Sequence, residues 1–277
     1  MRACSHEIVG DADYFRMSIG AGAKPGLDQI AAWEERFHQD GWVMLPGMLD
    51  DDEAARLRSV VEERHHAVSP GPRDDEADLI RGVALMRMFE TSGAFLQLMA
   101  REPALTLVER ILGEDCHVLS QTALRTPPFS GITRWHVDGP LWSPGLPRNI
   151  DWRPPCYSLS VMVALSGLED VAFGPTRVIV GSHLSGAVPD PDLPGAPHTT
   201  ILAKPGDAFL LNHQTWHCAH QNVSQRVRHM AVTAYGRRGV QQRFYPFLNY
   251  RCPDHVLAAC EAVTLRLLGR HEKGPLG

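Results

Sequence analysis

Hydrophobic positions in the first 115 residues recur every three or four residues, the spacing of helices with one buried face. Ile30, Trp33 and Phe37 show this spacing. Asp28 is a candidate N-cap for that helix, and Gly41 can end it. Acidic residues at 50–53 indicate the start of another helix rather than a metal loop. Helices are predicted over 28–40, 50–61, 92–100, 103–112 and 254–268.

From residue 116 the pattern changes to short β-branched or alternating runs separated by turns rich in Gly and Pro. In 157–165, Ser158 and Ser160 alternate with apolar residues, which predicts a strand with one buried face. Helices followed by many short strands favour a β-sandwich or barrel braced by helices. Strands are predicted over 42–45, 116–124, 135–138, 157–165, 177–180, 208–211 and 229–235.

Charge and composition exclude several classes of protein. The net charge is −5, and the 27 Lys and Arg residues are scattered, so no nucleic-acid partner is expected. No apolar run approaches the ~20 residues of a membrane span, so no membrane association is expected either. The first residues lack the apolar stretch of a signal peptide, and the six cysteines form no CxxC pair. We therefore expect a cytoplasmic protein with reduced thiols.

His136 and Asp138 are the first two candidate metal ligands along the chain. Residues i and i+2 of a strand point to the same side, so both side chains can reach one ion. An HxD pair alone is a weak signal among 14 histidines, and a third ligand is needed; His213, His217 and His220 are candidates. Two histidines and one carboxylate leave open positions that suit an Fe(II) oxygenase, and the absence of thiolates argues against structural zinc.

A series of short motifs extends this pattern along the chain. In order they are DGWVMLPGML at 40–49, WHVDG at 135–139, GPT at 174–176, GSH at 181–183, PGD at 205–207, and then His217, Asn222, Ser224 and Arg228. Together they resemble the phytanoyl-CoA dioxygenase-like family of Fe(II)/2-oxoglutarate-dependent oxygenases, over roughly residues 29–238. Several motifs in the family's order are far more specific than any one of them.

The resemblance implies a fold and a set of site residues. The fold is a mainly β double-stranded β-helix, a cupin-like jelly roll with helices packed outside. The metal ligands are His136, Asp138 and His217, because only His217 lies ten residues after Asp207 and five before Asn222, as in the family. Arg228 lies where the family places the arginine that pairs with the distal carboxylate of 2-oxoglutarate, a role suited to a planar, permanently charged fork.

The chain departs from the family pattern at two places. Ala219 stands where many relatives carry a Ser or Thr that contacts the co-substrate, so that contact must come from elsewhere or be missing. Ala172-Phe173-Gly174 replaces the usual Asn-Gly before Pro175, which affects the expected loop conformation. Asp138 is retained, and halogenating relatives carry a small residue there, so halogenation is disfavoured.

Residues of the substrate pocket are harder to predict. Trp142, Trp152 and Arg134 flank the first metal motif and are the candidates, whereas ordinary core packing explains Trp135 and Trp216 equally well. Asn222 and Ser224 are interpreted as shaping the turn after the third ligand. His183 is interpreted as part of a structural turn.

By resemblance, the protein uses Fe(II), 2-oxoglutarate and O2 to oxidise a small organic molecule, releasing succinate and CO2. Hydroxylation in natural-product tailoring is the expected reaction; ring closure, desaturation, epimerisation and an acyl-CoA substrate are alternatives. Two other classes stay open: a non-catalytic cupin-like metal-binding protein, and a zinc or manganese hydrolase. The partner is a small molecule, and the sequence predicts no oligomeric state.

The expected organisation is one oxygenase domain over 27–277 after a loose segment over 1–26. Its parts are helical support over 27–115, a jelly-roll core over 116–238 and a C-terminal extension over 239–277.

Overall fold

The structure is a computed structural model of the whole chain. It describes residue 14 and residues 19–67, 84–139, 155–193, 195–244 and 249–274.

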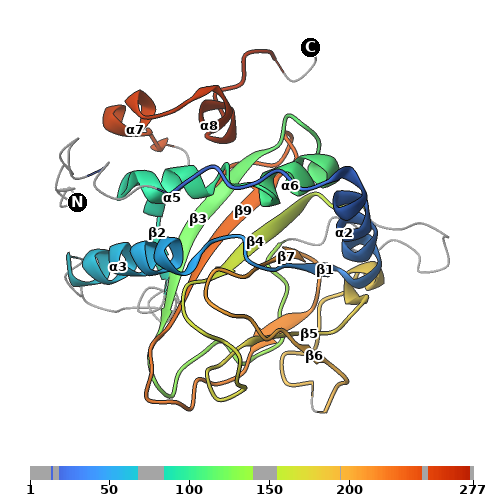
Figure 1. Cartoon of the computed structure of the whole chain (residues 1–277). Helices are drawn as coiled ribbons and strands as arrows, with labels where there is room; N and C mark the ends of the chain where they lie inside the picture. Colours follow the sequence, from blue (N-terminus) through green and yellow to red (C-terminus); the bar gives the residue numbers. More distant parts are fainter. Residues whose placement is uncertain are drawn as a thin grey trace.

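Two antiparallel sheets form the core (Figure 1). In the larger sheet the strand order is β1-β7-β4-β9-β3-β2, and in the smaller it is β6-β5-β8. The strands of the larger sheet are β1 (Trp42–Leu45), β2 (Ala84–Met86), β3 (His117–Thr126), β4 (Ser158–Ala164), β7 (Ala208–Asn212) and β9 (Arg228–Gly236). Those of the smaller sheet are β5 (Thr176–Val178), β6 (Thr199–Thr200) and β8 (His217–Ala219).

Both faces of the larger sheet are covered. Leu159, Val161 and Val163 of β4 pack into the core that the helices share, while Met162 and Ala164 pack toward the smaller sheet. Every residue of β4 is buried, so the prediction of a single buried face was wrong. The serines of β4 mark a polar interior, because their face lines a cavity instead of meeting solvent.

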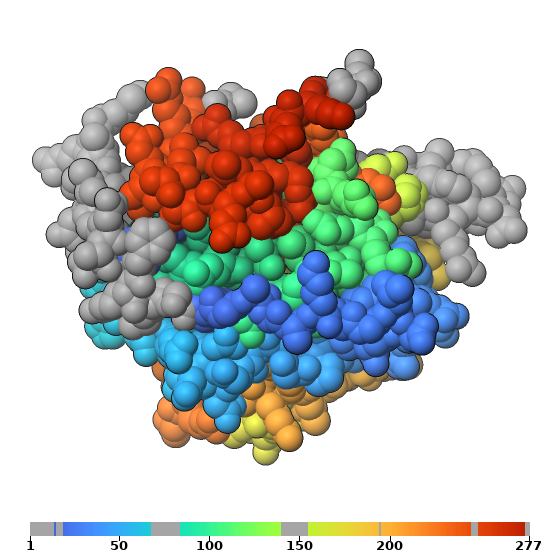
Figure 2. Space-filling model, turned by 45° about the horizontal axis from the view of Figure 1, so that its top comes forward, coloured from blue at the N-terminus to red at the C-terminus, as the bar shows by residue number. Residues whose placement is uncertain are grey.

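Helices cover one face of the larger sheet (Figure 1). The C-terminal helices lie along the outer side of α5 and α6 (Figure 2), where Arg266 donates to the Cys116 carbonyl at 2.7 Å. The helices are α2 (Leu27–Asp40), α3 (Asp51–Ala67), α5 (Gly93–Leu98), α6 (Ala104–Leu112), α7 (Asp254–Ala258) and α8 (Ala262–Leu267), with the 3-10 turns η1 (Met88–Glu90) and η2 (Ser182–Ser185).

Local interactions explain where helices begin and end. The Glu53 amide donates to Asp50 Oδ1 at 2.7 Å and the Asp50 amide to Glu53 Oε2 at 3.1 Å, a capping box that confirms the expected start of α3. The N-cap of α2 is Gly26, so Asp28 lies in the first turn and does not cap the helix as expected.

Gly41 ends α2 as expected, with φ of +82°. A Cβ at this position would lie 2.3 Å from Thr215 Oγ1 and 2.6 Å from His183 Nδ1, which leaves no space for a side chain. The Gly41 carbonyl accepts hydrogen bonds from the Thr215 hydroxyl and the Asn212 amide, both at 2.9 Å. The end of α2 is thereby fixed against the turn that precedes β8.

Three predicted elements differ from the structure. Residues 135–138 form no strand, and only His136 makes an isolated bridge, to His217. The predicted C-terminal helix is two short helices, because Glu261 is extended and its carbonyl accepts from Thr264 Oγ1 to begin the second. Within the N-terminal segment expected to be loose, Tyr14 is fully buried and donates to the Phe89 carbonyl at 2.7 Å, whereas residues 20–24 are exposed.

The five cysteines within the described ranges are all unpaired thiols, in line with the sequence. None of the helices in these ranges combines the length and apolar character required to cross a bilayer.

Candidate functional site

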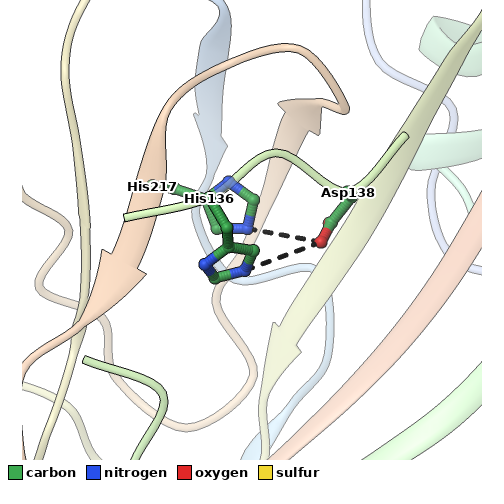
Figure 3. A group of neighbouring side chains, drawn as sticks. All are labelled: His136, Asp138 and His217. Atoms are coloured by element: carbon green, nitrogen blue, oxygen red, sulfur yellow. Dashed lines mark ion pairs between the residues drawn. The ribbon is translucent and has the colours of Figure 1, made fainter. Parts of the chain in front are cut away.

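His136, Asp138 and His217 lie together between the two sheets (Figure 3). Asp138 Oδ1 is 3.5 Å from His217 Nε2 and 3.8 Å from His136 Nε2. The centroids of the two imidazole rings are 4.2 Å apart. Among the described residues this is the one group of three or more potential ligands whose donor atoms all lie within 4.8 Å. The structure therefore brings together the three residues chosen from the sequence.

The main chain holds the three residues in place. His136 and His217 exchange both backbone hydrogen bonds, and the Asp138 amide donates to the His213 carbonyl, all at 3.0 Å. His217 begins β8, whereas His136 and Asp138 lie in an irregular segment beside it. The isolated bridge between His136 and His217 fixes the position of this segment, although the segment forms no strand.

Hydrogen bonds also fix the orientation of both imidazoles. His136 Nδ1 contacts the Arg134 carbonyl and His217 Nδ1 contacts the Thr215 carbonyl, each at 2.9 Å. A carbonyl only accepts, so each Nδ1 carries a proton, and Nε2 is the ring atom that faces Asp138. This is the tautomer in which both rings can bind a metal ion.

Electrostatics favour an ionised Asp138. Desolvation by the surrounding protein pushes the pKa of Asp138 up, although its side chain is 33% exposed, but His217, His213 and His136 around it hold that pKa well below its usual range. Burial lowers the pKa of His136. Burial also acts to lower the pKa of His217, but the Asp138 carboxylate outweighs it and the pKa of His217 is raised. A carboxylate between two Nε2 atoms is a donor set that suits a divalent metal such as iron.

The other two candidate histidines have different partners. His213 Nε2 shares a hydrogen bond of 2.8 Å with Ser160 Oγ, and burial lowers the pKa of His213 to about 4, so its ring is neutral at pH 7. His220 Nε2 shares a hydrogen bond of 3.1 Å with Thr200 Oγ1. Neither belongs to the group of three.

A cavity of about 390 Å³ opens beside the three residues. This volume lies within the ~300–1,000 Å³ of small-molecule sites. One wall is the inner face of β3, β4 and β9, and the other carries the metal-ligand candidates with Thr176 and Ala219. The cavity is therefore bounded by both sheets.

Arg228 begins β9 and lines the same cavity. Its side chain is buried, it donates to the Gly174 carbonyl, and its Nε has no hydrogen-bond partner among the described residues. Burial lowers the pKa of Arg228 to about 10, which still leaves the group charged at pH 7. A buried guanidinium without a counter-charge is costly, and a carboxylate ligand would remove that cost.

Arg226, the alternative anchor, has a different environment. Its guanidinium lies 4.5 Å from the ring centroid of Phe173, and Arg226 does not line the cavity that holds the three ligands.

Thr176 lies directly opposite Ala219 in the antiparallel pair of β5 and β8. Both residues line the cavity. Cross-strand neighbours have Cβ atoms ~5 Å apart, so the Thr176 hydroxyl reaches the space beside Ala219. Thr176 therefore supplies a hydroxyl next to the place where the sequence lacks one.

The turn after the third ligand depends on Asn222, which is fully buried. Its Nδ2 donates to the Arg226 carbonyl at 2.7 Å, and its Oδ1 accepts from the Ser224 hydroxyl at 2.7 Å. Both residues shape the turn, as the sequence indicated. Gly174, with φ of +74°, lies against this turn, where a Cβ would be 3.0 Å from the Asn222 nitrogen.

The predicted substrate residues are not gathered at the cavity. Trp142 and Trp152 lie outside the described residues. Arg134 is exposed, with Nε 3.5 Å from Asp192 Oδ1, and is not among the residues that line the cavity. Its backbone carbonyl orients His136, which is the contribution that the structure assigns to it.

Sequence reasoning missed several cavity residues. Ser120 and Thr122 of β3, Ser160 of β4, and Arg243 all line the cavity. Ser120 and Thr122 lie two positions apart in β3, as Ser158 and Ser160 do in β4, and hydroxyl residues at alternate positions of a buried strand face a polar interior. Arg243 lies in a loop and offered no such signal.

The fold and this site together define a jelly-roll protein with a two-histidine, one-carboxylate group and a buried arginine in one cavity. This arrangement has matches among known proteins. Residues 37–230 match the phytanoyl-CoA dioxygenase (PhyH) family, and the chain belongs to that family. The resemblance stated from the sequence motifs is thereby confirmed.

Relatives with assigned activities match about half of the chain. An ectoine dioxygenase of Streptomyces avermitilis is 28% identical over 160 residues, which cover 55% of this chain and 51% of the relative. An L-proline trans-4-hydroxylase of Streptomyces griseoviridis is 28% identical over 165 residues, 58% of each chain. The match thus spans only about half of the length of these relatives.

A solved structure shows the same fold over more of the chain. The epimerase SnoN, determined in complex with Fe3+, alpha ketoglutarate and nogalamycin RO, superposes with a TM-score of 0.60 over 79% of this chain and 87% of SnoN, at 20% identity. The mainly β, cupin-like fold expected from the sequence is confirmed, and within the described residues its strands form two sheets and no closed barrel.

Proposed function

We propose that the protein is an Fe(II)- and 2-oxoglutarate-dependent dioxygenase that oxidises a small organic molecule. His136, Asp138 and His217 would hold the iron through two Nε2 atoms and one carboxylate oxygen. When bound, iron and 2-oxoglutarate supply the oxidising chemistry, in which O2 is consumed and 2-oxoglutarate becomes succinate and CO2. Family membership supports this proposal.

One observation carries the proposal. The cavity that holds the three ligand candidates also holds Arg228, a buried guanidinium whose Nε has no partner among the described residues. A buried guanidinium beside the ligand candidates calls for an anionic ligand that reaches both it and the metal site. A dicarboxylate that chelates the metal at one end satisfies this guanidinium at the other.

The chain's own residues would bind and orient the co-substrate. Arg228 would pair with the distal carboxylate, and Thr176 would donate a hydrogen bond to it in place of the hydroxyl that Ala219 lacks. The Arg134 and Thr215 carbonyls would keep both imidazoles in the metal-binding tautomer. The Gly174 carbonyl would hold the guanidinium in its orientation.

Hydroxylation during natural-product tailoring is the reaction we propose. The L-proline trans-4-hydroxylase supports hydroxylation, and the SnoN structure with nogalamycin RO supports a natural-product substrate. Ring closure, desaturation and epimerisation require the same site.

Anaerobic titration calorimetry tests the proposal directly. Fe(II) should bind at one site per chain, and 2-oxoglutarate should bind tightly only after the metal. Release of succinate on admission of O2, increased by a substrate, would identify an oxygenase. Metal binding without any 2-oxoglutarate binding would instead favour the non-catalytic, cupin-like alternative.

A further inference from the structure

Arg243 is a second arginine in the cavity, and it belongs to neither the three ligand candidates nor the proposed co-substrate anchor. Its Nη1 lies 3.4 Å from the Asp138 carbonyl oxygen, beside the candidate metal site. This is the one side-chain hydrogen bond that Arg243 makes among the described residues, and none of their carboxylates forms an ion pair with it. The rest of its guanidinium is available to a ligand.

The backbone around Arg243 is held firmly. The Arg243 amide donates to the Leu119 carbonyl at 2.7 Å, and Gln242 Nε2 donates to the Val118 carbonyl at 2.9 Å. The next residue, Phe244, is buried, with its ring centroid 5.1 Å from that of Phe89. A charged group at a fixed position in a cavity loses little entropy when it binds a partner.

Arg228 and Arg243 serve opposite ends of the cavity. Arg228 of β9 lies opposite Thr126 of β3. The Arg243 amide donates to Leu119, whose neighbour Ser120 lies opposite Ala234 of β9. Ala234 lies six positions after Arg228 in β9, or about 20 Å along the strand at a rise of ~3.3 Å per residue. The two arginines therefore enter the cavity from opposite ends of the pair of β3 and β9.

The sheet surface changes in polarity between these two ends. Near Arg243, the hydroxyls of Ser120 and Ser160 flank the small side chain of Ala234, which is paired with both residues. The next row consists of Thr122, Val232 and Met162. The end near Arg243 therefore offers hydroxyl groups beside its cation.

The charges of the cavity leave Arg243 unmatched. Asp138, Arg228 and Arg243 are the Asp, Glu, Lys and Arg residues among the described lining. Under the proposed function, on which this step rests, Fe(II) is neutralised by Asp138 and one carboxylate of 2-oxoglutarate, and Arg228 by the other. One positive charge then stays at Arg243.

We infer that this end of the cavity, formed by Arg243, Ser120 and Ser160, binds a carboxylate group of the primary substrate. The substrate is then a small organic acid with polar groups near its carboxylate, bound on the side of Asp138 away from Arg228. A polycationic substrate such as an aminoglycoside is disfavoured, because it would place like charges together.

Paired probes test this inference without knowledge of the natural substrate. Acetate, benzoate, cyclohexanecarboxylate and L-proline are each compared with the matching primary amide. The protein is kept anaerobic with Fe(II) and saturating 2-oxoglutarate, so that Arg228 is occupied, and the thermal unfolding midpoint is measured. Carboxylates should raise the midpoint in wild type, and their amides should not.

Three variants give the comparison. Arg243→Gln should weaken carboxylate binding about tenfold or more and abolish the preference over amides, while 2-oxoglutarate still binds with wild-type affinity. Arg243→Lys should keep the preference. Arg238→Gln is the matched control, since Arg238 follows β9 and bonds the Lys273 carbonyl outside the cavity, and it should behave as wild type.

Two results would overturn the inference: amides that bind wild type as well as carboxylates do, or a preference that survives in Arg243→Gln. Failure of the proposed function is visible separately, as wild type that takes up no iron or 2-oxoglutarate in calorimetry. In that case the same probes are applied to the protein alone, and the contrast between wild type and Arg243→Gln still decides the role of Arg243.

Discussion

His136 and His217 exchange both of their backbone hydrogen bonds, each 3.0 Å long, although 81 residues separate them in the sequence. The main chain alone therefore brings the two imidazoles together. Replacing either ring leaves these bonds in place, so substitutions at the site can test metal binding without dismantling the fold.

His217→Ala should abolish saturable Fe(II) binding. Two protein donors remain, and we expect affinity to fall by more than the ~10–100-fold that follows loss of a residue that only orients a ligand. The measurement is calorimetric titration, together with the rise in unfolding temperature that iron causes in wild type. His220→Ala is the control and should bind iron normally. If His220→Ala fails to bind iron and His217→Ala binds it, the choice of His217 from its spacing is wrong.

Arg228→Ala should raise the apparent KM for 2-oxoglutarate by about ten- to a thousand-fold, because a charge-assisted pair of ~1.5–4 kcal/mol is lost. Iron affinity should change little. Steady-state succinate release at varied 2-oxoglutarate gives the KM. Arg226→Ala should behave as wild type, and a larger effect there than at Arg228 would reassign the anchor.

Thr176→Val should raise the KM for 2-oxoglutarate about tenfold, because a hydrogen bond to a charged group contributes ~1.5–3 kcal/mol. Valine has nearly the same shape, so the pair of β5 and β8 should persist. The double change Thr176→Val with Ala219→Ser should recover most of the affinity by returning a hydroxyl from the opposite strand. An unchanged KM in Thr176→Val would show that this hydroxyl takes no part.

Asp138→Ala should weaken Fe(II) binding and lower oxidised product by orders of magnitude, since Asp138 is the one negative donor of the group. Any remaining activity is expected to depend on chloride, which can enter the vacated position. Metal content and succinate release, with and without chloride, are the measurements. Full iron loading with normal succinate release would contradict the metal-site assignment.

Stability should fall as the pH is lowered from 7 toward 4, in part because of Glu62 and His229, which share a hydrogen bond. Burial lowers the pKa of His229 below 6.5 in the folded protein. As the pH falls below 6.5, His229 is therefore protonated in the unfolded chain before it is protonated in the folded protein, which favours unfolding. Bonds from His229 and Arg125 outweigh burial and lower the pKa of Glu62 below 4.5, so its stabilisation is lost at lower pH still. Both contributions have the same sign.

Urea unfolding of wild type and His229→Gln between pH 7 and pH 4 checks this prediction. The variant should lose less unfolding free energy than wild type between pH 7 and 5.5. Equal losses in both proteins would exclude His229 as a source of the pH dependence.

Much of the site was predictable because its residues lie at characteristic separations along the chain. His136, Asp138, His217 and Arg228 were chosen from spacing, and the structure gathers all four at one cavity. Spacing could not reveal Thr176 as the neighbour of Ala219, because that pairing depends on the register between β5 and β8. Arg243 was missed for a similar reason, since a loop residue enters the cavity only through its bonds to β3.

The fold was predictable in its elements but less so in its layers. Alternation in β4 correctly indicated a strand, but it was interpreted as a buried face opposite a solvent face. The serines of β4 face the interior, because the smaller sheet closes over them. Short segments such as β8, three residues long, carry too few positions for any periodicity to be recognised.

The strand order also determines when in folding a metal site can exist. Leu45 of β1 pairs with Ala208 of β7, 163 residues later in the chain, and β3 pairs with β9 across a similarly long interval. Pairings between such distant segments make folding slow, because long loops must close before any contact compensates for the lost entropy. During synthesis, His136 and Asp138 emerge long before His217 and the strands that position it. The nascent chain therefore lacks the complete set of three candidate ligands, and any binding of metal by this set must follow the closure of the sheets.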